Sequence, residues 1–126
     1  MPAVELIGVS QDRGGRRVLS GLDLSVDDGE LVALLGPSGC GKTTALRIVA
    51  GFDEPTAGEV RLGGRDVRGV PPYRRDVNLV FQDYALFPHL TVERNVAFGL
   101  EMLRLPASES AARVAETLAL VRLDGL

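Results

Sequence analysis

Residues 31–50 decide the fold, and they read LVALLGPSGCGKTTALRIVA. The first five side chains are all apolar and do not alternate with polar ones, which predicts a central strand at 31–35 that is covered on both faces. Residues 36–41 contain three glycines and one proline and cannot continue that strand. The apolar residues of 43–50 recur at helical spacing. They predict a helix that ends at Gly51 and has an apolar side formed by Leu46, Val49 and Ala50.

Shorter apolar stretches lie on either side of this segment. Alternating or β-branched residues between glycine and proline turns predict four further strands, at residues 4–9, 22–26, 59–62 and 77–81. From Thr91 onward the apolar residues recur at helical spacing. We expect one helix that ends before Pro106 and a second helix with Ser108 as its N-cap. Because strands precede helices, the sequence indicates an α/β domain with antiparallel strands near the N-terminus and a helical portion at the C-terminal end.

Composition is typical of a soluble globular domain. The 126 residues are 45% hydrophobic and 25% charged, which suits one domain with a core and argues against disorder. The net charge of -3 and the lack of a basic block argue against a nucleic-acid partner. Cys40 is the only cysteine, so neither an internal disulfide nor a multi-cysteine zinc site is expected. The sequence shows neither a signal peptide nor an apolar run of about 20 residues, as is typical of a cytoplasmic protein.

Residues 36–43 match the phosphate-loop pattern G-x-x-x-x-G-K-[ST] at every fixed position. Glycines let backbone N–H groups turn inward, and the positive end of the following helix adds to them, so the loop forms a cradle for nucleotide phosphates. We expect Lys42 to reach the β- and γ-phosphates and act in hydrolysis, Thr43 to ligate Mg²⁺, and Thr44 to extend the phosphate contacts. The predicted nucleotide-binding residues of the loop are Gly36, Pro37, Ser38, Gly39, Cys40, Gly41, Lys42, Thr43 and Thr44.

The basic residues support this interpretation of the loop. Lysine and arginine total 14, and Lys42 is the only lysine among them. It stands where a compact ammonium fits and a guanidinium fork would crowd the cradle. The alternative is a glycine-rich joint between strand and helix that binds nothing. For Cys40 the alternatives are a redox-active thiol at a helix start and a small residue tolerated in the loop, of which we favour the second.

Three blocks together resemble the nucleotide-binding subunit of ABC transporters: GPSGCGKTT at 36–44, AGFDEPTAGEV at 50–60 and VNLVFQDYALFPHLTVERNVAFGL at 77–100. They are most similar to the importer ATPases that handle polyamines, sugars and ferric iron. The resemblance implies an α/β phosphate-loop NTPase core, ATP as the nucleotide, Mg²⁺ as its metal, and hydrolysis that powers solute import. The run at 70–77 leans toward the polyamine branch.

The resemblance gives Gln82 the place of the Q-loop glutamine, a catalytic residue that contacts Mg²⁺ or the attacking water. A neutral amide suits that role because its oxygen ligates a hard cation without adding charge. The segment Gln82–Leu90 is similar to the surface that receives a membrane permease, although its apolar residues fit a protein core equally well. The implied partners are a second ATPase subunit, identical or paired, the permease and, indirectly, a periplasmic or external solute-binding protein. The implied location is cytoplasmic, on the inner face of the cell membrane.

The sequence departs from the family pattern in two ways. Arg13 stands where the family has an aromatic residue against adenine. A guanidinium also stacks on a base, so we expect Arg13 and Val18 to line the adenine pocket, the alternative being a solvated turn arginine. The family's signature, Walker B and switch motifs do not occur in 1–126. We therefore expect a partial nucleotide-binding domain, with a helical subdomain from about 91–126, that does not hydrolyse ATP alone. A non-transport ABC ATPase and a module that only binds nucleotide are the rival interpretations.

Overall fold

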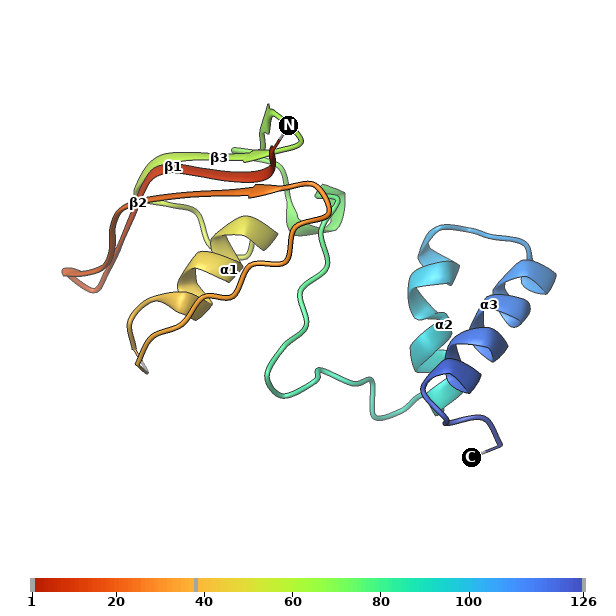
Figure 1. The fold of residues 1–126 in the computed structure, drawn as a ribbon. Coiled ribbons are helices and arrows are strands. Elements are labelled where there is room, and N and C mark those ends of the chain that lie inside the picture. The colour runs from red at the N-terminus through yellow and green to blue at the C-terminus, as the bar shows by residue number, and fades with distance from the viewer. Residues whose placement is uncertain (1, 38, 126) are drawn as a thin grey trace. The chain divides into compact units, whose positions relative to one another are not determined.

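The computed structural model describes residues 2–37 and 39–125, which form two compact units, Met1–Leu79 and Val80–Leu126 (Figure 1). The first unit is an antiparallel sheet with a helix packed on one face. The second unit is a segment of turns followed by two helices. Ser38, one of the predicted loop residues, lies outside the described residues.

The sheet of the first unit is built from four strands. They span Pro2–Arg13 (β1), Arg16–Asp27 (β2), Ala57–Leu62 (β3) and Arg65–Asp66 (β4), and a short 3-10 helix, η1, follows at Pro72–Arg74. The strand order is β2-β1-β3-β4, and every pair is antiparallel. Leu6 of β1 lies opposite Leu24 of β2 on one side and opposite Val60 of β3 on the other. The predicted antiparallel sheet is confirmed. β1 and β2 extend beyond the predicted bounds, and β4 has no counterpart among the predicted strands.

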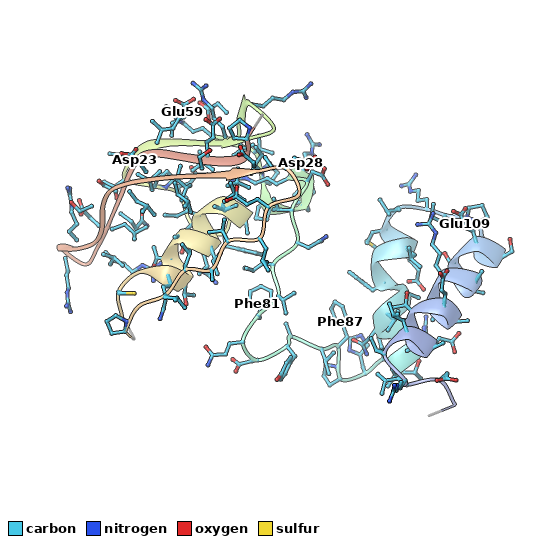
Figure 2. The ribbon with its side chains drawn as sticks, viewed as in Figure 1. Asp23, Asp28, Glu59, Phe81, Phe87 and Glu109 are labelled. Carbon is cyan, nitrogen blue, oxygen red and sulfur yellow. The ribbon has the colours of Figure 1, made fainter. Side chains whose placement is uncertain are left out.

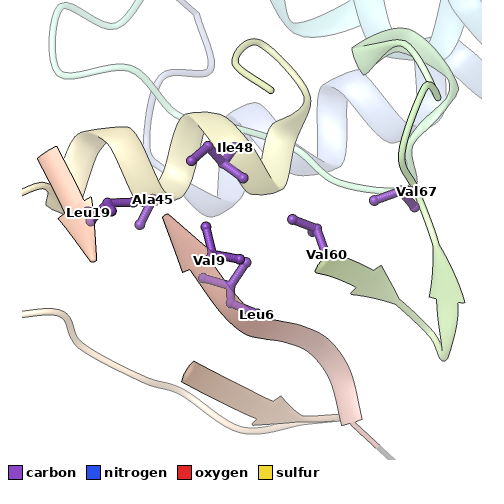
Figure 3. Close-up of a cluster of buried hydrophobic side chains, with 7 residues drawn as sticks. All are labelled: Leu6, Val9, Leu19, Ala45, Ile48, Val60 and Val67. Atoms are coloured by element: carbon purple, nitrogen blue, oxygen red, sulfur yellow. The ribbon is translucent and has the colours of Figure 1, made fainter. Parts of the chain in front are cut away.

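Helix α1, Lys42–Ala50, packs on one face of this sheet (Figure 3). The buried residues of the helix are Thr44, Ala45, Ile48 and Ala50. Of the predicted apolar side, Ala50 is buried and Val49 packs against the core, whereas Leu46 is exposed, so the prediction is wrong for Leu46 alone. The helix side chains join those of the strands in one buried cluster, which consists of Leu6, Val9, Leu19, Ala45, Ile48, Val60 and Val67. Burial of one aliphatic side chain stabilises the fold by about 1.5–3 kcal/mol. This cluster therefore fixes the position of α1 on the sheet.

Arg75 holds the C-terminal end of α1, and its side chain is only 2% exposed. The guanidinium donates to the carbonyl oxygens of Ile48 and Val49 in the last turn of α1, at 3.0 and 3.2 Å. It also donates to the carbonyl oxygens of Val67 and Val70, at 3.0 and 2.9 Å. A cation at this end complements the negative end of the helix dipole. Arg75 therefore joins α1 to the chain that follows β4.

Gly51 ends α1, as the sequence predicts. Its φ of 92° lies in the left-handed region that favours glycine. A Cβ at this position would also lie 2.7 Å from Nε of Arg75. Because Gly51 has no side chain, the guanidinium of Arg75 can lie against the end of the helix.

The second unit contains helix α2, Val92–Met102, and helix α3, Ala107–Leu120, which pack against each other. The Thr91 hydroxyl caps α2 by accepting a hydrogen bond from the Arg94 N–H at 3.2 Å. The N-cap of α3 is Pro106 rather than the predicted Ser108. Proline fits there because its fixed φ already suits the entry to a helix. Within 2–37 and 39–125, the length and apolar character needed to cross a membrane are found in no helix.

Residues 31–35 and 77–81 are not strands in this structure, so these two predictions are wrong. Leu31 and Leu35 are 98% and 91% exposed. An extended segment becomes a strand only when its N–H and C=O groups pair with a neighbouring strand. Among the described residues, the sheet pairings are those of β1 with β2, β1 with β3 and β3 with β4, and none involves either segment. Apolar composition makes both segments suitable for a sheet, but pairing requires a partner.

The role of Arg75 can be tested against its neighbour Arg74. Arg75→Ala removes the donor from four carbonyl oxygens. We expect it to lower the free energy of unfolding by about 3 kcal/mol, because each unsatisfied buried polar group costs about 1–3 kcal/mol. Arg74→Ala removes an exposed side chain and should change it by less than about 0.5 kcal/mol. Urea unfolding measures both values, and equal effects would show that Arg75 does not hold α1.

Candidate functional site: the phosphate loop

The phosphate-loop residues enter α1 through two left-handed glycines. Gly41 is the N-cap of α1 with a φ of 98°, and Gly39 has a φ of 83°. This region costs other residues about 1–2 kcal/mol. The backbone of the loop therefore favours glycine at Gly41, which the motif fixes, and at Gly39, which stands at a variable position of the motif.

Close contacts add a second requirement for glycine. A Cβ on Gly41 would lie 2.6 Å from Cδ2 of Leu19 and 3.1 Å from the carbonyl oxygen of Val18. A Cβ on Gly36 would lie 2.7 Å from Sγ of Cys40. The first contact seats the end of the loop against β2 and places Val18 beside it. The second contact shows that the loop folds back on itself.

Lys42 turns back across the loop, and its Nζ donates a hydrogen bond to the carbonyl oxygen of Gly36. The ammonium of the only lysine in the sequence therefore lies at the loop, beside the start of α1. The first N–H groups of a helix have no partner within the helix, and the helix dipole makes this end positive. The ammonium, the N–H groups and the dipole together favour an anion at this position.

The two threonines after Lys42 differ in exposure. Thr43 is exposed, whereas Thr44 is buried. A hydroxyl that solvent reaches at the start of the helix has the chemistry of a Mg²⁺ ligand, because Mg²⁺ in nucleotide sites binds one or two protein oxygens together with phosphate oxygens. The residues of the loop therefore fit a Mg²⁺ that is carried by the nucleotide. The roles assigned to Thr43 and Thr44 stay predictions.

Arg13, the predicted adenine-stacking residue, is engaged in an ion pair. Its Nη2 lies 2.8 Å from Oδ2 of Asp53, which also accepts from Nε of Arg47 at 3.0 Å. Asp53 lies just beyond the C-terminal end of α1, whereas Val18 borders Gly41 at the N-terminal end. These contacts place the two predicted adenine residues near opposite ends of α1. The stacking role of Arg13 stays a prediction.

Gln82 belongs to the second unit, in the segment of turns that precedes α2. Its side chain is exposed, and a turn closes beside it where the Tyr84 N–H donates to the carbonyl oxygen of Phe81 at 3.0 Å. Tyr84 and Leu86 are 78% and 71% exposed. The apolar side chains of this segment therefore lie on the surface of the second unit as the structure describes it.

Sequence reasoning misses two polar residues that shape these surroundings. Arg75 stands beside Arg74 in the sequence, and no sequence pattern distinguishes the buried arginine from the exposed one. Asn95 lies in the first half of α2, and its amide bonds to the turn segment before the helix. An asparagine inside a helix is intrinsically unfavourable, which was the available signal that its side chain has a specific partner.

The comparison with known families decides the assignment. The family model for the ABC transporter matches residues 19–126. The chain belongs to the ABC transporter family. The match includes the phosphate loop, Gln82 and both helices of the second unit, so the family to which the three sequence blocks point is confirmed. The interpretation of the loop as a joint that merely connects strand and helix loses its support.

Three curated relatives of this ABC transporter chain carry the same name, spermidine/putrescine import ATP-binding protein PotA. The protein from Thermobifida fusca is 58% identical over 127 residues, which cover 98% of this chain and 33% of the relative. The protein from Rubrobacter xylanophilus is 57% identical over 98% of this chain and 33% of its own length. The protein from Acidothermus cellulolyticus is 64% identical over 82% of this chain and 27% of its own length. The chain thus spans about a third of the length of the curated relatives it matches.

A solved structure agrees with the fold. The dimeric structure of a post-hydrolysis state of the ATP-binding cassette MJ0796, bound to ADP and Pi, superposes with a TM-score of 0.83 and 30% sequence identity. The superposition covers 97% of this chain and 58% of the chain of the solved structure. The predicted fold class, an ABC ATPase domain with an antiparallel N-terminal sheet, is therefore confirmed. The predicted strands at 31–35 and 77–81 remain the exceptions.

The packing of the loop on β2 can be tested with two glycine variants. Gly41→Ala has two costs in stability. The left-handed backbone conformation costs alanine about 1–2 kcal/mol, and the clash of its Cβ with β2 costs about 1–3 kcal/mol. Gly39→Ala adds only the first cost, because no atom lies within 4 Å of its Cβ. We expect Gly41→Ala to lower the free energy of unfolding more than Gly39→Ala does. Equal losses in urea unfolding would contradict the close approach of Gly41 to Leu19.

Proposed function

We propose that the chain is the phosphate-binding part of an ATP-hydrolysing subunit that powers polyamine import. The observation that carries the proposal is the loop at 36–44, which seats its end on β2 and places the Lys42 ammonium at the start of α1. Membership of the ABC transporter family supports ATP as the nucleotide. The shared name of the curated relatives supports spermidine and putrescine as the class of solute.

In this proposal the loop binds the phosphates and stabilises the charge that develops on them. Backbone N–H groups around Gly39 and Gly41 and the positive end of α1 face the β-phosphate, and Lys42 exchanges its bond to Gly36 for the β- and γ-phosphates. Fixed donors aimed at developing charge are the main source of catalysis in phosphoryl transfer. Mg²⁺, when bound with ATP, would neutralise charge on the β- and γ-oxygens, with Thr43 as its protein ligand.

Gln82 completes the proposed chemistry. Its amide oxygen orients the attacking water, and its neutral side chain adds no charge that repels the phosphates. The family resemblance supports this role, and the exposure of Gln82 is compatible with contact to a nucleotide. Adenine recognition by Val18 and Arg13 belongs to the same proposal. For Arg13, adenine recognition requires that the guanidinium stack on the base, either while it stays paired with Asp53 or after it leaves Asp53.

The proposed partners follow from the resemblance and from the names of the relatives. A second ATPase subunit faces the phosphate loop, as the resemblance implies, and the dimeric state of the solved neighbour supports the presence of a second subunit. A membrane permease binds the segment Gln82–Leu90, in which Tyr84, Leu86 and Phe87 are exposed. A periplasmic or external solute-binding protein acts through the permease. The location that goes with these partners in the proposal is the cytoplasm, on the inner face of the cell membrane.

Lys42→Ala tests the proposed chemistry in the full-length subunit. Loss of a hydrogen bond from a charged group costs about 1.5–3 kcal/mol, so ATP affinity should fall by roughly tenfold or more and hydrolysis should stop. Arg68→Ala, which removes an exposed cation of the same unit, should leave both unchanged. Fluorescent ATP binding and phosphate release measure the two effects. Near-normal hydrolysis by Lys42→Ala would overturn the assignment.

The isolated chain tests a second part of the proposal. Residues 1–126 contain the loop and Gln82 but none of the later family motifs, so they should bind Mg·ATP weakly and release no phosphate above the Lys42→Ala background. Phosphate release by the 126-residue chain and by its Lys42→Ala variant measures this. Turnover that the variant abolishes would show that residues 1–126 hold a complete catalytic site.

A further inference from the structure

Asn95 of α2 bonds with both ends of its side-chain amide to the turn segment that precedes the helix. Its Oδ1 accepts the Phe87 N–H at 2.9 Å. Its Nδ2 lies 2.9 Å from the Thr91 carbonyl oxygen and 3.2 Å from the carbonyl oxygens of Phe87 and Leu90. One side chain thus bonds to three residues of the segment 87–91.

The pairing with Phe87 resembles that between two strands. The amide of Asn95 accepts from the N–H of Phe87 and donates to its C=O, as a neighbouring backbone would. The orientation of the amide follows from its partners, because the N–H needs an acceptor and the carbonyl oxygens need a donor. Alanine removes all of these bonds, and aspartate keeps only the one to the Phe87 N–H.

The ring of Phe87 is held by the same helix. Figure 2 labels Phe87 in the segment before α2. Its ring lies 4.6 Å from the ring of Phe98, centroid to centroid, with an interplanar angle of 43°. Asn95 and Phe98 are three residues apart and therefore share one face of α2. Phe87 is thus fixed twice, at its backbone by Asn95 and at its ring by Phe98.

This fixed segment continues directly from the exposed apolar residues Tyr84 and Leu86. A surface loop that is ordered before binding loses less conformational entropy when a partner docks on it. The hydrogen bonds of Asn95 therefore supply a property that a docking surface needs and that helix packing alone does not give. Other asparagine roles, such as capping, are already filled at α2 by Thr91.

We propose that Asn95 is a positioning residue that fixes Phe87–Leu90 in the shape that receives the permease. The inference rests on the proposed function, which assigns Gln82–Leu90 as the permease surface. Asn95 itself acts through the backbone of Phe87, Leu90 and Thr91. The permease then meets a preformed loop, and the affinity of the subunit for the permease depends on an amide in α2.

The experiment uses the full-length subunit with its permease and three variants. Asn95→Ala removes all bonds of the amide, and Asn95→Asp removes its donors. Glu101→Ala, an exposed change on the same helix, is the matched control. Basal ATP hydrolysis should be unchanged in all three. In both Asn95 variants, half-maximal stimulation by the permease should require roughly tenfold more subunit, with the maximal rate retained.

Hydrogen exchange separates a positioning role from a general effect on stability. Loss of a purely structural residue would speed exchange throughout the unit, whereas loss of a positioning residue speeds it in the loop alone. The amides of 87–91 should exchange faster in Asn95→Ala, while those of α3 stay unchanged, and Glu101→Ala should behave as the wild type. Unchanged exchange in 87–91, or normal stimulation of both Asn95 variants, would overturn this inference alone. A wild-type subunit that the permease does not stimulate would overturn the proposed function, and the inference with it. If Asn95→Ala does not fold, Asn95→Asp carries the same prediction.

Discussion

The packing of α1 on the antiparallel sheet is the constraint on which the phosphate loop depends. Ile48 and Val9 are almost completely buried where helix and sheet meet, so the helix cannot shift without opening the core. Its N-terminal end is seated where Gly41 meets Leu19, and its C-terminal end is bound by the guanidinium of Arg75. A helix that is fixed at both ends and along its side aims its positive end in one direction, which is what a phosphate site requires.

The second unit applies the same principle to a protein surface. α2 holds the segment before it through polar and aromatic contacts, in place of an aliphatic core. Few of the residues that the structure describes in this unit are buried, and Val114 is the buried residue of α3. In a unit with few buried side chains, a loop depends more on side-chain hydrogen bonds to stay ordered. Asn95 makes most of the hydrogen bonds that order this segment.

The sequence predicts what is local and misses what depends on partners. The phosphate loop, the end of α1 at Gly51 and the antiparallel strands around Leu6 follow from glycine placement and periodicity. The strand predicted at 31–35 fails because an apolar run specifies burial but not the neighbour that buries it. The role of Arg75 could not be predicted, because its four acceptors are backbone carbonyls that only the tertiary fold brings together.

Hydrogen exchange of the full-length subunit with and without Mg·ATP tests most directly whether the loop on α1 is the nucleotide site. Bound phosphates accept the N–H groups of the loop and of the first turn of α1, so those amides should be protected. The predicted result is strong protection in peptides that span 36–45, which Lys42→Ala weakens. Protection elsewhere with none in 36–45 would contradict the assignment of the phosphate loop.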